Sequence, residues 1–92
     1  MLNLRRESLY DAIMSTNGGI FTVKFRKKDG QERVINCRLG VKSYLHGGVA
    51  TVRNDGHPYI IAFDLKAKGY RCINLYTTSQ LRAGGAEFRI IG

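Results

Sequence analysis

The sequence predicts a mainly β protein of the α+β class, in which an N-terminal helix precedes a small five-stranded β-barrel. Three observations lead to this prediction. Helical spacing of apolar residues is confined to residues 1–17, short runs of alternating apolar and polar residues follow it, and glycine-containing turns separate these runs. The 92 residues are expected to form a single domain, with the barrel in 20–91, because a chain of this length has room for one core.

The helix is expected over residues 4–15. Leu9, Ala12 and Ile13 fall at helical spacing, and the glycine pair after Asn17 ends the helix because glycine tolerates a left-handed conformation. A helix this short is not stable alone, so we expect it to pack against one end of the sheet.

The first two strands are expected at residues 20–28 and 31–39, joined by an Asp29-Gly30 turn, which is a strong hairpin signal. Alternation with a period of two assigns the side chains to faces. On the first strand, Phe21, Val23 and Phe25 alternate with Thr22, Lys24 and Arg26; on the second, Arg33, Ile35, Cys37 and Leu39 alternate with Val34, Asn36 and Arg38.

Three more strands are expected in the second half, after an irregular insertion at 40–57. The run 59–65 is almost continuously apolar, which favours a central strand buried on both faces. Strands at 70–76 and 87–91 follow, with a short 3₁₀ or capped turn at 77–81 between them. Closure into a barrel would remove the exposed edges of such a sheet.

The charge balance favours an anionic partner. The chain has 15 Lys and Arg residues against 7 Asp and Glu, a formal net charge of +8, which suits phosphate backbones or acidic protein surfaces. The alternative is that the charge only maintains solubility. No run of about 18 apolar residues could span a membrane, and the first residues lack the apolar run of a signal peptide. We therefore expect a cytoplasmic protein without a membrane role.

Neither catalysis nor a bound cofactor is expected. Asp64 is the only acidic residue in an apolar setting and has no evident acid–base partner, and His46 and His57 lie beside no recognisable nucleophile. The cysteines, Cys37 and Cys72, are expected to be buried, inert thiols of a reducing compartment, and these few ligands predict no metal site.

Segments 23–39 and 63–75 carry a family resemblance. They resemble the small bacteriophage relatives of the WYL domain, which have an Sm-like, SH3-like β-barrel. Phe63 and Tyr70 stand where that family often has Trp, Tyr76-Thr77-Thr78 replaces an acidic–basic pair, and residues 40–57 do not resemble it. The resemblance implies a viral protein acting in the host bacterial cytoplasm. The matching positions are Asp29-Gly30, Arg33, Cys37, Leu39, Phe63-Asp64, Tyr70-Arg71 and Ile73.

A basic face of the barrel is the main candidate site, and contact with nucleic acid, DNA or RNA, is the first functional hypothesis. Basic side chains would follow phosphates while Tyr44, Tyr59 and Tyr70 stack on bases. Arg71 has two equally weighted interpretations: a binding group, or an ion-pair partner of Asp64 across the hairpin. The candidate binding residues are Lys24, Arg26, Lys28, Arg38, Lys66, Lys68, Tyr70 and Arg71.

The second hypothesis is a viral modulator or inhibitor that docks on an acidic surface of a host bacterial protein. Such docking needs an apolar hot spot with a polar rim, which Tyr44, Leu45 and Val49 in the irregular insertion could supply. A homo-oligomeric ring that pairs exposed edge strands is a third possibility.

Overall fold

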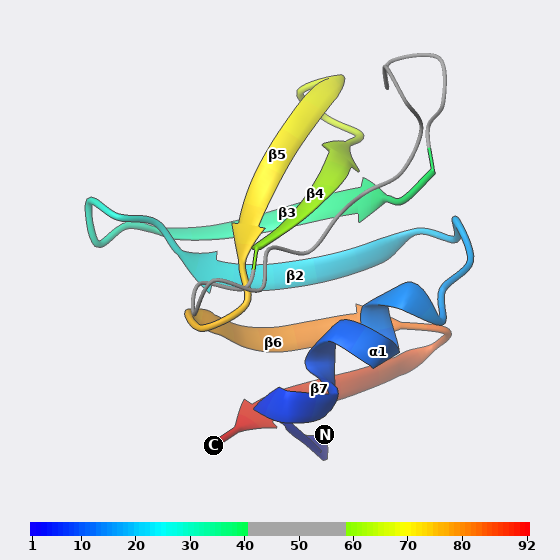
Figure 1. Ribbon diagram of the computed structural model, residues 1–92, viewed down its shortest axis with the longest axis vertical. Helices are drawn as coiled ribbons and strands as arrows, with labels where there is room; N and C mark the ends of the chain where they lie inside the picture. Colours follow the sequence, from blue (N-terminus) through cyan, green and yellow to red (C-terminus); the bar gives the residue numbers. More distant parts are fainter. Residues whose placement is uncertain (41–58) are drawn as a thin grey trace.

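The computed structural model describes residues 1–40 and 59–92 of the chain. The mainly β class with a short N-terminal helix is confirmed (Figure 1). The elements are β1 (Leu2–Arg5), the 3₁₀ turn η1 (Arg6–Ser8), α1 (Leu9–Met14), β2 (Phe21–Arg26), β3 (Glu32–Arg38), β4 (Tyr59–Asp64), β5 (Gly69–Asn74), β6 (Thr78–Ala83) and β7 (Ala86–Ile91).

The strands of the described residues form one seven-stranded sheet in the order β1-β7-β6-β2-β3-β4-β5. The β1–β7 pair is parallel and the other pairs are antiparallel. Within the described ranges the sheet is not closed, since β1 and β5 stand at its two ends, so the expected five-stranded barrel is not confirmed. Figure 1 shows the β4–β5 hairpin running steeply across β2 and β3. This divergence follows from the short β3–β4 ladder, which contains only Cys37 opposite Asp64 and Arg38 opposite Phe63.

The β2–β3 hairpin matches its prediction. Its register runs from Phe21 opposite Cys37 to Arg26 opposite Glu32, so the predicted faces are the observed ones. Gly30 adopts a positive φ of 88° in the turn, a conformation that glycine takes without strain. The turn closes where the amide of Lys27 donates to the carbonyl of Gln31 at 2.8 Å.

Residues 77–81 are the clearest correction to the sequence prediction. Instead of a turn, the chain forms β6, which pairs with both β2 and β7. Leu81 lies opposite Val23 and is buried, as is Thr78, whose hydroxyl donates to the carbonyl of Asn74 at 2.8 Å. The polar residues of β6 conceal its alternation, because only Leu81 and Ala83 on its inner face are apolar.

The N-terminal prediction is also partly wrong. Residues 2–5 form β1 rather than the start of a helix, with Leu2 opposite Phe88 and Leu4 opposite Ile90. Pairing with a strand at the far end of the chain leaves no local signal in the sequence. The helix itself is shorter than predicted, and Asn17, at a φ of 51°, follows it as expected.

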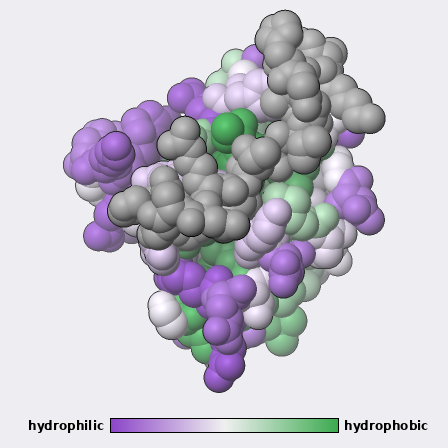
Figure 2. Space-filling model, viewed as in Figure 1, coloured by the Kyte–Doolittle hydropathy of each residue, from purple (hydrophilic) through white to green (hydrophobic). Residues whose placement is uncertain are grey.

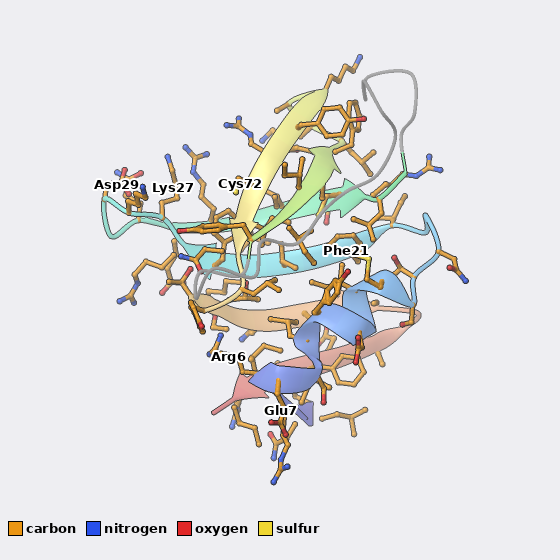
Figure 3. The ribbon with its side chains drawn as sticks, viewed as in Figure 1. Arg6, Glu7, Phe21, Lys27, Asp29 and Cys72 are labelled. Atoms are coloured by element: carbon orange, nitrogen blue, oxygen red, sulfur yellow. The ribbon has the colours of Figure 1, made fainter. Side chains whose placement is uncertain are left out.

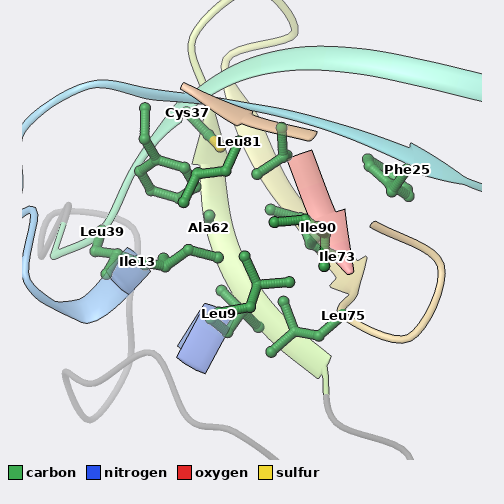
Figure 4. Packing of buried hydrophobic residues seen from close by; sticks show 13 residues of the cluster. Leu9, Ile13, Phe25, Cys37, Leu39, Ala62, Ile73, Leu75, Leu81 and Ile90 are labelled. Atoms are coloured by element: carbon green, nitrogen blue, oxygen red, sulfur yellow. The ribbon is translucent and has the colours of Figure 1, made fainter. Parts of the chain in front are cut away.

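The core lies between α1 and one face of the sheet. Leu9 and Ile13 of the helix are fully buried and pack into a cluster from β2, β3, β4, β5, β6 and β7 (Figure 4). Two burial predictions need correction. Ile61 of β4 is 37% exposed, so this strand is not buried on both faces, and Cys72 is exposed although Cys37 is buried. No helix in the described ranges is long and apolar enough to cross a membrane.

Candidate functional site

A cleft of about 1040 Å³ lies between the end of the β2–β3 hairpin and the β4–β5 hairpin. Basic and aromatic side chains make up much of its lining. The basic ones are Arg26, Lys27, Lys28, Arg33 and Arg71, and the aromatic ones are Phe25, Tyr59 and Tyr70. Figure 2 shows hydrophilic side chains gathered at the end of the β2–β3 hairpin, at the left of the view.

The β2–β3 hairpin supplies four of the five cations. Lys27 and Lys28 stand at its exposed tip, where Figure 3 shows Lys27. Arg33 lies opposite the core residue Phe25 and therefore on the inner face of β3, but its side chain is exposed and lines the cleft. Among the described residues, no ion pair involves Lys27, Lys28 or Arg33. Their charges are therefore available to an anionic ligand.

Arg71 of β5 is the cation of the opposite wall. Its Nε lies 3.5 Å from Oδ2 of Asp64, so the ion pair considered from the sequence is present. The Asp64 side chain is only 7% exposed, whereas that of Arg71 is 54% exposed. Arg71 is therefore ion-paired with Asp64 and still partly open to solvent. The ion-pair interpretation is confirmed, and the binding interpretation stays a prediction.

Asp64 also shapes the β4–β5 turn. Its Oδ1 accepts hydrogen bonds from the amides of Lys66 at 3.0 Å and Ala67 at 3.2 Å, and its carbonyl accepts one from the amide of Lys68. This carboxylate therefore holds the turn that follows β4.

The aromatic side of the cleft lies on the β4–β5 hairpin. Tyr59 and Tyr70 are half-buried and on the same face of the two strands as Ile61 and Cys72. The rings of Tyr70 and Phe63 meet edge to face, with centroids 5.6 Å apart and an interplanar angle of 77°. Arg71 is on the opposite face of β5 from Tyr70 and Cys72, so these side chains line the same cleft from different faces of the hairpin.

The structure divides the residues that the sequence analysis grouped together. Arg26, Lys28, Tyr70 and Arg71 line the cleft. Lys24 and Arg38 lie elsewhere, on the outward face of the sheet, and Lys66 and Lys68 are on the exposed β4–β5 turn. Lys24 is 3.2 Å from a carboxylate oxygen of Glu32, and Nε of Arg38 donates to the carbonyl of Gly18 at 3.0 Å. Tyr44, Leu45 and Val49, the candidate docking loop, fall outside the described residues.

Sequence reasoning missed Lys27 and Arg33. Arg33 shares its face with Ile35 and Cys37, so a cation on the apolar face of a strand was the signal that could have located it. Lys27 lies within the predicted strand 20–28 with the parity of Val23 and Phe25, so a cation on the apolar face was the signal here too. In the structure β2 ends at Arg26, and Lys27 lies beyond it.

The two cysteines differ in exposure, because Cys37 is buried and Cys72 is exposed. Burial, and then the nearby charge of Asp64, raise the pKa of Cys37 from 9.0 to about 12, so its thiol stays protonated and unreactive at neutral pH. Because this pKa is raised in the folded state, the thiol leaves the free energy of unfolding at its full value below pH 9.0. That free energy then falls as the pH rises toward about 12. Cys72 instead lines the cleft (Figure 3). Within residues 1–40 and 59–92, no three His, Cys, Asp or Glu residues are grouped to hold a metal ion.

The chain matches no protein-family model, and it has no significant match among curated proteins or among solved structures. Function is therefore inferred from the chemistry of the cleft.

Proposed function

We propose that this protein binds nucleic acid, with the phosphate backbone held in the cleft between its two hairpins. The observation that carries the proposal is the convergence of five basic side chains on one cleft that aromatic side chains also line. Proteins that bind single strands combine cations along the backbone with aromatic rings on which bases stack. The formal net charge of +8 adds a long-range attraction for such a ligand.

The distribution of carboxylates supports binding at the cleft rather than on the outer face of the sheet. On the outer face, Lys24 lies near Glu32 and Arg82 pairs with Glu87. In the cleft, Arg26 also lies near Glu32, and Arg71 lies near Asp64. At the hairpin tip, Lys27 and Lys28 are exposed and take part in none of the ion pairs of the described residues. Of the five cleft cations, Lys27, Lys28 and Arg33 therefore offer charge that no ion pair of the described residues offsets. We propose a binding role without catalysis.

We further propose that the protein is a bacteriophage relative of the WYL domain with an SH3-like barrel, acting in the cytoplasm of a bacterial host. Support comes from the two segments that carry the resemblance. Segment 23–39 contains most of the β2–β3 hairpin and segment 63–75 contains β5 and the turn before it, and these two hairpins border the cleft.

The test is the affinity for a labelled oligothymidylate at increasing salt. For single strands, each phosphate contact contributes about 0.7 to the slope of log K against log salt, so five contacts give a slope of about −3.5. A fourfold increase in salt should then weaken binding roughly a hundredfold. A variant with Lys27→Ala, Lys28→Ala and Arg33→Ala should reduce the slope by about 2.

The matched control removes three cations from the outer face: Arg38→Ala, Arg82→Ala and Arg89→Ala. It lowers the net charge equally but should preserve most of the affinity. Equal losses of affinity in the two triple variants would show that only net charge matters. That result would refute the cleft as the binding site. The docking hypothesis would be favoured by two results together. The protein would bind no oligonucleotide, and it would retain an acidic protein from a nuclease-treated bacterial lysate.

A further inference from the structure

We infer that Asp64 is a positioning residue that holds Arg71 ready to bind a phosphate group in the cleft. This inference rests on the proposed function and assigns separate roles to two residues of the same site. Arg71 contacts the ligand, and Asp64 acts only through Arg71. The steps below follow from burial, hydrogen bonding and the geometry of the guanidinium group.

Asp64 is a buried charge whose two oxygens have different partners. Oδ1 accepts from the amides of Lys66 and Ala67, and these bonds fix the side chain in one orientation at the end of β4. Oδ2 lies 3.5 Å from Nε of Arg71. A buried carboxylate needs such partners, because an uncompensated charge is costly away from water. The backbone turn therefore aims one carboxylate oxygen at β5.

Arg71 is suited to use this anchor. A guanidinium group carries five N–H donors in a planar fork, and Nε supplies only one of them. With Nε 3.5 Å from Oδ2 of Asp64, Arg71 is ion-paired, yet its side chain is still 54% exposed and lines the cleft. A phosphate can accept two parallel bonds from such a fork. Holding the arginine before the ligand arrives reduces the rotamer entropy lost on binding.

Arg26 provides the comparison within the same cleft. Its Nη2 is 3.7 Å from Oε1 of Glu32, but both side chains are well exposed, at 62% and 49%. Pairs of this kind are screened by water and hold their partners weakly. Only the Arg71 pair has a buried carboxylate fixed by backbone amides among the described residues of the cleft. Arg71 is therefore the cleft cation with the most restricted orientation.

The experiment is a double-mutant cycle on oligothymidylate affinity with Asp64→Asn, Arg71→Ala and the variant that combines them. Asparagine retains Oδ1 for the turn amides but removes the negative charge that orients Arg71. We expect Arg71→Ala to weaken binding about tenfold and to reduce the salt slope by about 0.7. Asp64→Asn should weaken binding about threefold in the wild-type background and less than 1.5-fold in the Arg71→Ala background.

A second variant separates orientation from charge and does not depend on how well Asp64→Asn folds. Arg71→Lys keeps the charge but loses the planar fork, so its salt slope should be unchanged while its affinity falls several-fold. Arg89→Ala, on the outer face of β7, is the control and should bind as the wild type does.

The outcomes distinguish the two proposals. Equal effects of Asp64→Asn in both backgrounds, or wild-type affinity in Arg71→Lys, would overturn the positioning role while leaving nucleic-acid binding intact. If the unmodified protein binds no oligonucleotide, the proposed function itself fails.

Discussion

At the scale of single residues, Arg6 links the two ends of the chain to the β5–β6 turn. Its Nε donates to the carbonyl of Gly92 at 3.1 Å, and its Nη1 donates to the carbonyls of Leu75 at 2.6 Å and Thr78 at 2.9 Å. These acceptors are backbone groups at the C-terminus and on both sides of the β5–β6 turn. Figure 3 shows Arg6 at this junction.

We predict that Arg6→Ala lowers the free energy of unfolding by about 2 kcal/mol, because charged hydrogen bonds are lost and partly buried carbonyls lose their donor. Urea denaturation would measure the change. The control is Arg5→Ala, whose exposed ion pair with Glu7 should contribute less than about 1 kcal/mol. A similar small effect for both variants would contradict the structural role of Arg6.

The candidate site shows what single residues reveal before a structure is known. Arg26, Lys28, Tyr70 and Arg71 were recognisable as a basic and aromatic set near two turns, and all four line the cleft. Lys24 and Arg38 belonged to the same sequence pattern but lie on the outward face. Alternation assigns residues to faces of a strand, but it does not show where the core ends or where two hairpins diverge.

At the scale of elements, local pattern predicted the strands that carry strong alternation or clear turns. The β2–β3 hairpin and β7 fall within about two residues of their expected ranges. β6 and β1 were missed for two different reasons. β6 has only two apolar residues, Leu81 and Ala83, and β1 pairs in parallel with a strand more than 80 residues later in the chain. Neither feature produces a periodic signal, so tertiary pairing decides both elements.

Leu81 tests the assignment of β6. Its side chain is 1% exposed and faces Val23 across the strand pair, so Leu81→Ala should lower the free energy of unfolding by about 3 kcal/mol. In a surface turn, the same substitution would cost only about 0.5 kcal/mol. Ile91→Ala is the control, because Ile91 at the end of β7 is 40% exposed and should cost less than about 1 kcal/mol. Urea denaturation of both variants would distinguish the two assignments.

At the scale of the whole molecule, the sheet presents two basic surfaces with different character. One is the outward face of the sheet, where Lys24 and Arg82 pair with carboxylates. The other is the cleft, where the cations stand beside aromatic rings and the divergence of two hairpins creates a concave space. The net charge was evident from composition, but its division between a flat face and a cleft depends on how β4 and β5 leave the plane of β3.

The measurement that tests the central claim most directly is mapping of the bound surface by NMR. Amide resonances of the ¹⁵N-labelled protein would be followed during titration with oligothymidylate at low salt. We predict that the largest shifts occur at Lys27, Lys28, Arg33 and Arg71, with little change at Arg38 and Arg89 on the outer face. If the largest shifts instead occur at the outer-face residues and the cleft resonances do not move, nucleic-acid binding in the cleft is contradicted.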